Sequence, residues 1–322
     1  MALQTSGAIS LNDMHIEVGG SSGTTVSLND ADIRGLIGKG SGAQSSFSEF
    51  YGAAASTTLT SAGTVNGQNQ QKQITVSSFI SSGETLEIPS NLWVWSESHS
   101  QAALLIDIPC TIVNYGKIIG QGGSNNSRDG GDAIRINSGV SGVTIQNMSG
   151  GYIAGGGGYG KDGYGYGGGG AGGGVGGQSS GTYGVGGSLN ASGANGLNPY
   201  NDGAYKAGQG GGAGGGGGGA ALISPYGYPK YGGGGGRILP GTGGAGGVDQ
   251  SNGGAGGSAG NAGSNGGATV GGGVRGAGGG GGWGANGGLD SNGGTPYSGG
   301  KAINDNGVSY TLSNSGTIYG GT

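Results

Sequence analysis

The sequence predicts a mainly β protein with much irregular structure. We expect a small N-terminal docking segment, a β-solenoid or β-sandwich-like scaffold, and a glycine-rich bundle of polyglycine II helices. Three observations predict this architecture. Glycine supplies 94 of the 322 residues, against roughly 7% in average proteins. Short β-branched runs with Asn and Gly turns lie on both sides of the glycine-rich region. A duplicated Ser-Leu-Asn-Asp motif opens the chain.

Residues 1–55 contain the duplicated motif, in 9–20 and again in 26–40. Each copy predicts a short helix with an asparagine N-cap, Asn12 in the first copy and Asn29 in the second, followed by acidic residues in the first turn. So short a segment has few apolar anchors, so we expect it to dock onto a partner and to gain its core there. The docking residues that we expect are Leu11, Ile16, Leu28, Ile33, Phe47, Phe50 and Tyr51.

Residues 56–153 change in composition to Thr, Val, Ile, Ser and Asn, in short runs separated by polar turns. This pattern predicts short β-strands. Trp93 and Trp95 must lie on one face of their strand, because side chains alternate along a strand. They are either core residues or an exposed pair that stacks on sugars.

A repeat links this scaffold to the end of the sequence. The segments 111–123, 144–158 and 310–322 each combine β-forming residues, an Asn, a Gly and then an Ile followed by Gly. Repeated short strands with Asn and Gly turns are typical of β-solenoid rungs. We therefore expect residues 299–322 to rejoin the scaffold, and residues 154–298 to be an insertion.

The insertion is rich in nearly pure glycine tracts, and within 252–267 glycine occupies every third position. A period of three indicates an extended three-fold helix. The chain has only seven prolines, which argues against collagen. Polyglycine II helices can satisfy one another's backbone groups side by side where no Cβ intervenes. A flexible glycine linker is the rival interpretation, but the return to the β motif argues against it.

Glycine tracts that alternate with aromatic-rich segments resemble the distal tail-fibre adhesins of T-even-like bacteriophages. The duplicated Ser-Leu-Asn-Asp motif also resembles the N-terminal segments of phage tail proteins. The resemblance covers mainly residues 150–298. It implies a virion tail protein whose polyglycine II lattice carries receptor-binding loops.

Overall charge and cysteine content exclude several other classes of protein. Lys and Arg number 12 against 16 Asp and Glu, so we expect no nucleic-acid partner. No apolar run approaches the roughly 20 residues of a membrane span, and the N-terminus lacks the features of a secretory signal. We therefore expect synthesis in the host bacterial cytoplasm and no membrane insertion. The single cysteine, Cys110, has apolar neighbours and predicts a buried thiol.

Motifs for chemistry are weak in this sequence. Residues 155–162 nearly match a phosphate-binding loop, but Asp162 replaces the required hydroxyl residue, and glycine-rich sequence makes such a match easy. A glycan depolymerase would need paired carboxylates, and nothing in the sequence pairs the candidates. We expect no enzyme activity, no cofactor and no metal. The carboxylates considered are Glu84, Glu87, Glu97, Asp107, Asp129 and Asp132.

Most of the fifteen tyrosines fall in the glycine-rich region. Tyrosine offers rigid, amphipathic contact area at low entropy cost, so we expect these residues to contact a host surface glycan or outer-membrane protein, beginning with the tyrosines of 159–166. The alternatives are a structural tail or baseplate component that reads no receptor, and an ice-binding protein. We expect a homotrimer. The receptor-binding residues that we expect are Tyr200, Asn201, Asp202, Tyr205, Lys206, Tyr226, Tyr228, Lys230 and Tyr231.

Overall fold

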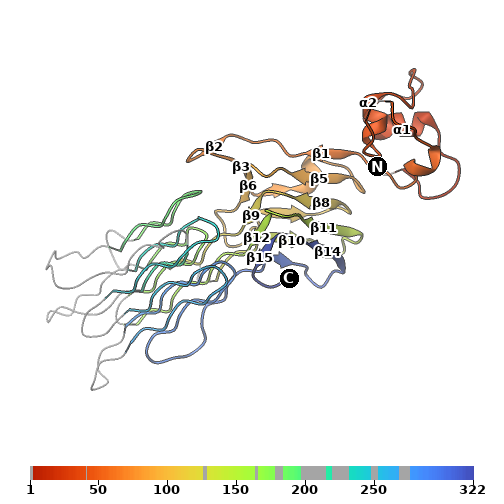
Figure 1. Cartoon of the computed structure of the whole chain (residues 1–322). Helices are drawn as coiled ribbons and strands as arrows, with labels where there is room; N and C mark the ends of the chain where they lie inside the picture. Colours follow the sequence, from red (N-terminus) through yellow and green to blue (C-terminus); the bar gives the residue numbers. More distant parts are fainter. Residues whose placement is uncertain are drawn as a thin grey trace.

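The computed structural model is mainly β, with few helices. Figure 1 shows a helical N-terminal segment at one end, stacked strands in the middle, and extended glycine tracts that run away from the strands. Among the described residues, none of the helices has the length and apolar character that crossing a bilayer requires. The structure describes residues 3–40, 42–125, 129–163, 166–177, 184–196, 215–219, 232–247, 253–267 and 276–322.

The N-terminal segment has a small core of its own, which corrects the expectation that a partner supplies it. Leu3, Met14, Ile33 and Phe50 are buried together. Around them lie α1 (Leu11–Glu17), α2 (Ala31–Gly35) and the 3-10 turn η1 (Phe47–Phe50).

The helix caps also differ from the prediction. The N-cap of α1 is Ser10, whose hydroxyl accepts from the Asp13 N–H while Asp13 Oδ2 accepts from the Ser10 N–H. The second copy repeats half of this box, because the Ser27 N–H donates to Asp30 Oδ2 (2.8 Å). The N-caps are therefore Ser10 and, without a side-chain cap bond, Asp30, and not the expected Asn12 and Asn29.

The strands form three sheets, with strand orders β1-β5-β8-β11-β14, β2-β3-β6-β9-β12-β15 and β4-β7-β10-β13. All pairs are parallel except β2 with β3. From β5 onward the chain visits the three sheets in a fixed order, so each winding stacks on the one before (Figure 1). The strands are β1 Ser56–Thr58, β2 Thr64–Val65, β3 Gln68–Lys72, β4 Ile74–Thr75, β5 Thr85–Ile88, β6 Leu92–Trp95, β7 Leu104–Ile106, β8 Thr111–Asn114, β9 Lys117–Ile119, β10 Ile134–Ile136, β11 Val143–Asn147, β12 Tyr152–Ala154, β13 Ile303–Asn304, β14 Tyr310–Asn314 and β15 Thr317–Tyr319.

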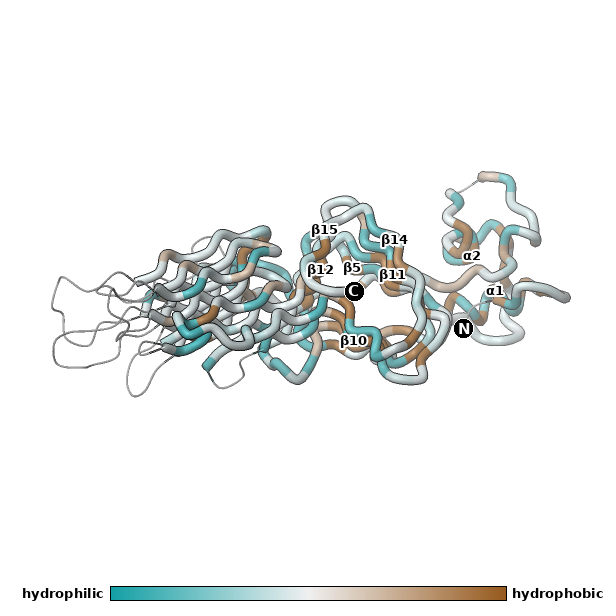
Figure 2. The backbone as a smooth tube through the Cα atoms, turned by 90° about the horizontal axis from the view of Figure 1, so that it is seen from below, coloured by the Kyte–Doolittle hydropathy of each residue, from teal (hydrophilic) through white to brown (hydrophobic). Residues whose placement is uncertain are grey.

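Alternation along the strands fills the space between the sheets. In β11, Val143, Ile145 and Asn147 are buried, while the two residues between them are partly exposed. The equivalent residues of the other strands make one apolar core, which includes Cys110 as expected. Figure 2 shows hydrophobic residues concentrated in the windings and in the N-terminal segment, whereas the glycine tracts are nearly neutral in hydropathy.

The segments that the sequence aligns as a repeat stack in register. Asn147 lies beside Asn114 on one side and Asn314 on the other. The side-chain amide of Asn114 donates to Asn147 Oδ1, and that of Asn147 donates to Asn314 Oδ1, both at 2.8 Å. Asn114 and Asn147 have no exposed surface. A buried amide needs such partners, so this asparagine ladder fixes the register of the turns.

The glycine tracts lie between β12 and β13. The chain leaves and re-enters the windings at adjacent points, because the Gly155 N–H donates to Tyr319 O (2.9 Å) and the Gly300 N–H donates to Gly156 O (2.7 Å). Residues 155–300 are therefore inserted between two windings that remain in register with each other.

Each tract is hydrogen-bonded to several neighbouring tracts. Gly278 and Gly281 donate to the carbonyls of residues 161 and 158, Gly279 and Gly282 donate to those of residues 264 and 261, and Gly280 donates to that of residue 217. Glycines that are three residues apart therefore donate to the same neighbouring segment. A Cβ added to Gly280 would lie 2.1 Å from Gly169 O, so the packing distance depends on the absence of side chains.

Candidate functional site

The candidate site is the end of the glycine tracts farthest from the strands. Hydrogen bonds join residues that flank several undescribed segments: Gly219 accepts from Gly247, Gly247 accepts from Gly253, and Gly267 accepts from Gly276, at 2.8–3.0 Å. The flanks of 220–231, 248–252 and 268–275 thus meet at one end of the bundle. Figure 1 shows that the tracts extend on the side of the strands away from the N-terminal segment.

The expected receptor-binding residues belong to the segments 197–214 and 220–231, which lie outside the described residues. Their role stays a prediction. The flanks of the second segment are nevertheless fixed, because the Gly233 N–H donates to Gly218 O (3.0 Å). The segment that carries Tyr226, Tyr228, Lys230 and Tyr231 therefore begins and ends on neighbouring tracts.

Tyr159 corrects the expectation that the first tyrosines of the region face the host. It is fully buried, its hydroxyl donates to Asp162 Oδ1 (2.6 Å), and its ring lies 6.2 Å from that of Tyr297. Asp162 also accepts from the Gly167 N–H (2.8 Å). Lys161 donates to Gly293 O (2.8 Å) beside buried Asp290. The residues that nearly match a phosphate-binding loop thus make hydrogen bonds within the chain.

The near end of the bundle packs on the sheet that contains β6. Trp93 and Trp95 are 2% and 3% exposed, which confirms that they share a face and decides for the core interpretation over an exposed pair. Their indole N–H groups donate to Gln68 Oε1 (3.2 Å) and Gln70 Oε1 (2.8 Å). The turns of the tracts contribute the other half of this apolar junction, namely Ala171, Leu189, Leu239, Ala259 and Trp283.

Arg237 lies in this junction and is 6% exposed. Its guanidinium stacks 4.4 Å from the ring centroid of Trp95 and donates to Gly172 O (2.8 Å), Gly187 O (3.0 Å) and Gln121 Oε1. Burial lowers the pKa of Arg237 to about 10, so the group keeps its charge at neutral pH. Arg237 is not among the residues that the sequence predicts to be functional. In the sequence, Arg237 stands out only as a single basic residue between five consecutive glycines and an Ile-Leu-Pro sequence.

His99 borders the same junction. Its Nε2 donates to Gly122 O (2.7 Å), and Ser124 Oγ lies 3.3 Å away. Desolvation is the main cause that lowers the pKa of His99, and the positive charge of Arg237 lowers it further, while the bond to Gly122 opposes both. The neutral imidazole is therefore the form that fits the junction.

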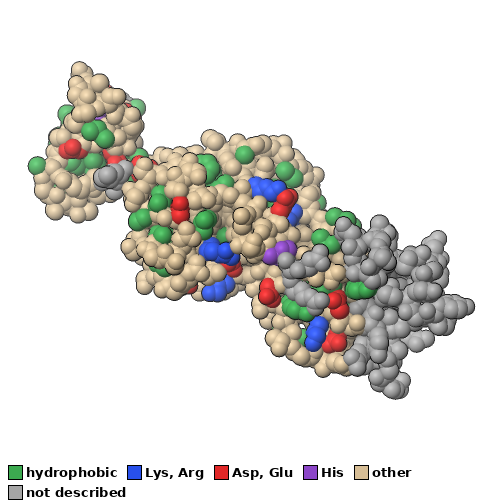
Figure 3. Space-filling model, turned by 180° about the vertical axis from the view of Figure 1, so that it is seen from behind, with side chains coloured by type: hydrophobic (Ala, Val, Ile, Leu, Met, Phe, Trp, Pro, Cys, Tyr) green, Lys and Arg blue, Asp and Glu red, His purple; other side chains and the backbone are tan. Residues whose placement is uncertain are grey.

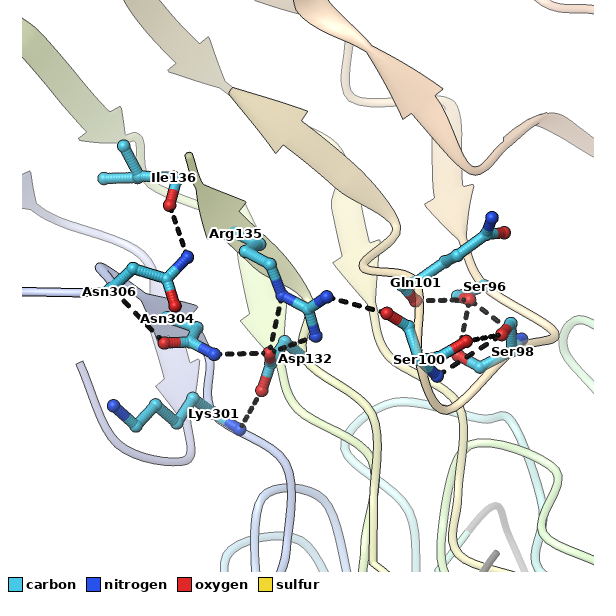
Figure 4. Close-up of polar contacts among 10 residues, drawn as sticks. All are labelled: Ser96, Ser98, Ser100, Gln101, Asp132, Arg135, Ile136, Lys301, Asn304 and Asn306. Atoms are coloured by element: carbon cyan, nitrogen blue, oxygen red, sulfur yellow. Dashed lines mark hydrogen bonds and ion pairs between the residues drawn. The ribbon is translucent and has the colours of Figure 1, made fainter. Parts of the chain in front are cut away.

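The outer face of the sheet that contains β10 carries a polar network (Figure 4). Asp132 accepts from Arg135 Nη2 (2.8 Å), from the side-chain amide of Asn304 (2.8 Å) and from the Lys301 N–H (3.1 Å). Arg135 Nη1 also donates to Ser100 O (2.7 Å). This network ties the winding before the glycine insertion to the winding after it.

Most of the carboxylates considered for a depolymerase have structural partners. Asp107 accepts from Ser77, Glu84 from Ser81, Asp129 from Ser298, and Glu97 pairs with Lys72. On the face of the molecule that Figure 3 shows, the charged side chains of the described scaffold lie in small separate groups and not in one continuous patch. Within the described ranges, no group of three or more His, Cys, Asp or Glu residues could hold a metal ion.

The expected docking residues of the N-terminal segment fall into two groups. Ile33 and Phe50 are fully buried in the segment's own core, and Leu11 and Leu28 pack against it. Ile16, Phe47 and Tyr51 are 49%, 39% and 39% exposed, so these three are the ones available to a partner.

Residues 81–215 match the model of the family described as "Phage tail fibre adhesin Gp38". The match is less than half of the chain. It spans the windings from β5 to β12 and the first glycine tracts. No curated protein and no solved structure matches. Over residues 81–215 the chain is therefore similar to the phage tail fibre adhesins that this family describes.

Proposed function

We propose that the chain attaches a virion tail to a receptor on the host bacterial surface, a glycan or an outer-membrane protein, without catalysis. The family match carries this proposal. The arrangement supports it, because the far end of the glycine bundle and the N-terminal segment lie at opposite ends of the molecule (Figure 1). One end can thus hold the tail while the other meets the host.

The proposal also covers the architecture of the windings and of the glycine tracts. The three-sheet windings form a β-solenoid scaffold, and the glycine tracts form a bundle of polyglycine II helices. The three-residue period of the hydrogen bonds from Gly278 to Gly282 supports the second assignment, because a polyglycine II helix has three residues per turn and outward-pointing backbone groups. Many modest bonds of about 0.5–1.5 kcal/mol must form together to offset the entropy of ordered glycine.

Hydrogen exchange tests this bundle assignment. We expect slow amide exchange in the described tracts 167–171, 232–236 and 276–282. Exposed turns such as 138–142 serve as the fast reference. Exchange in the tracts at the rate of the reference turns would exclude a packed bundle.

The attachment function is tested with purified protein and intact host cells. Replacement of Tyr226, Tyr228 and Tyr231 by Ala should abolish cell binding, whereas Tyr115→Ala on the scaffold should leave it unchanged. If the triple variant binds as well as the wild type, the receptor site is not in residues 226–231. If the wild-type protein does not bind cells that the virus infects, a purely structural tail component becomes the better interpretation.

The N-terminal segment is proposed to hold the tail partner through its exposed apolar side chains, Ile16, Phe47 and Tyr51. The homotrimer remains an expectation from sequence. Analytical ultracentrifugation of the purified chain tests it, and a sedimentation coefficient that corresponds to a single chain would rule it out.

A further inference from the structure

Arg237 joins three glycine tracts to the scaffold through one side chain. Gly172 and Gly187, which accept from its Nε and Nη1, end two other tracts at the junction. Gln121, which accepts from its Nη2, follows β9 in the scaffold. The backbone of Arg237 adds two bonds to a further turn, because its N–H donates to Ala191 O (2.9 Å) and its carbonyl accepts from the Asn190 N–H (3.0 Å).

The chemistry of this contact is directional. A guanidinium is a planar fork whose N–H groups have fixed directions, and it can stack on an aromatic face at the same time. Here the guanidinium carbon lies over the Trp95 ring, 4.4 Å from its centroid, while the N–H groups reach carbonyl or amide oxygens of separate chain segments. An ammonium group has no such plane and could not hold all of these oxygens in their present directions.

The apolar contacts of the junction lack this directionality. Leu189, Leu239 and Trp283 remove apolar surface from water on Trp93 and Trp95, and that driving force is roughly proportional to area and does not depend on direction. Backbone bonds from the Gly122 N–H to Gly172 O (3.1 Å) and from the Gly123 N–H to Gly157 O (2.7 Å) restrict rotation beside these apolar contacts, and Arg237 adds side-chain bonds to Gly172 O and Gly187 O. A buried charge is costly unless its hydrogen bonds are made, so the guanidinium penalises every rotated position in which Gly172 O or Gly187 O moves away.

We infer that Arg237 is a positioning residue that, together with these backbone bonds, sets the direction in which the glycine bundle projects from the windings. The consequence for attachment rests on the proposed function, because it assumes that the far end of the bundle binds the receptor. The direction itself is a property of the free protein and can be measured without a receptor.

The experiment measures the distance between two spin labels, attached to cysteines introduced by Ser138→Cys on the scaffold and Thr295→Cys in the glycine region. Both positions are exposed. The native Cys110 is 2% exposed, and burial raises its pKa to about 12, so it does not take up the label. The labelled protein otherwise keeps the full chain.

The test variant is Arg237→Lys and the matched control is Arg34→Lys. Arg34 is also buried, at 3% exposed, and donates to the backbone carbonyls of Gly40 and Ala43 inside the N-terminal segment. We expect a single narrow distance distribution for the wild type and for Arg34→Lys, and a broadened or shifted distribution for Arg237→Lys. An unchanged distribution in a folded Arg237→Lys protein overturns the inference.

A milder variant keeps the test open if Arg237→Lys does not fold. Gln121→Ala removes one acceptor of the guanidinium and should broaden the distribution to a smaller extent, and an unchanged distribution again counts against the inference. Host-cell binding is measured in parallel. If Arg237→Lys broadens the distances but binds cells like the wild type, the positioning role stands, and the proposed receptor function of the far end fails.

Discussion

At the scale of single residues, two kinds of residue hold the windings and the tracts: asparagines whose amides form a hydrogen-bonded ladder, and glycines that leave room for a neighbouring backbone. Asn147 occupies the middle of the ladder and also reaches Thr317 O (3.3 Å). The sequence reveals the asparagines as part of a repeat, because they recur at one place in three similar segments. It could not show that they touch, because the second and third copies are separated by the whole insertion.

Asn147→Ala should destabilise the protein more than the neighbouring change Gln146→Ala. Asn147 has no exposed surface, and its loss leaves the amides of Asn114 and Asn314 without their shared partner. An unsatisfied buried group costs about 1–3 kcal/mol. Urea unfolding followed by tryptophan fluorescence measures the difference. Equal unfolding midpoints for the two variants would show that the ladder contributes little.

Gly280→Ala should disrupt the packing of the tracts, because the new Cβ would meet Gly169 O at 2.1 Å. A backbone shift of this kind costs about 1–3 kcal/mol. The control is Gly40→Ala, where nothing lies within 4 Å of the added Cβ. We expect faster amide exchange in 276–282 for Gly280→Ala only. Unaltered exchange in that variant would mean that the tracts are not tightly packed.

At the scale of elements, the junction combines apolar turns, a stacked guanidinium and a neutral histidine. The sequence predicted the tryptophan pair from strand alternation, which is a local rule. It did not reveal Trp283 or Arg237 as their partners, because both come from turns far along the chain, and their role depends on how the tracts fold back. The burial of Tyr159 was missed for a related reason: the tracts that enclose its ring beside Asp162 are brought together only by the fold.

The junction should weaken in mild acid. The folded pKa of His99 is below its usual value of about 6.5, so protonation favours the unfolded chain, which binds more protons in this range. The stability that the neutral ring contributes is complete above about pH 6.5 and is lost as the pH falls through the folded pKa.

We therefore expect the thermal midpoint to fall between about pH 7.5 and about pH 5.5, and to fall less in His99→Gln. The other histidine gives the control, because His15→Gln lies in the N-terminal segment, away from this junction. A pH dependence that is identical in His99→Gln and the wild type would contradict the assignment.

At the scale of the whole molecule, the N-terminal segment and the windings are packed around separate cores. The N-terminal segment has its own core of Leu3, Met14, Ile33 and Phe50, and the windings have another. The sequence predicted the order of these parts from composition alone, because a change from β-branched residues to glycine is visible without a structure. The repeat aligned the strands of two sheets, but it did not reveal the third sheet, since strands as short as the two residues of β4 and of β13 carry too little pattern.

Removal of residues 1–55 should leave a folded chain that still binds host cells but no longer joins the virion tail. The windings bury their own apolar residues without help from the N-terminal segment, so their thermal midpoint should change little. Virions assembled with the shortened chain should lack it when purified particles are examined by mass spectrometry. Normal incorporation would place the tail-binding surface elsewhere.

The adjacent exit and return points of the insertion have a consequence for how such a chain can diversify. Gly155 and Gly300 both lie against the last winding, and the strands on either side stay in register across the gap. Closing a longer loop costs only about 0.6 kcal/mol for each doubling of its length. Glycine-rich segments can therefore lengthen or shorten at this point while the windings that frame them keep their register.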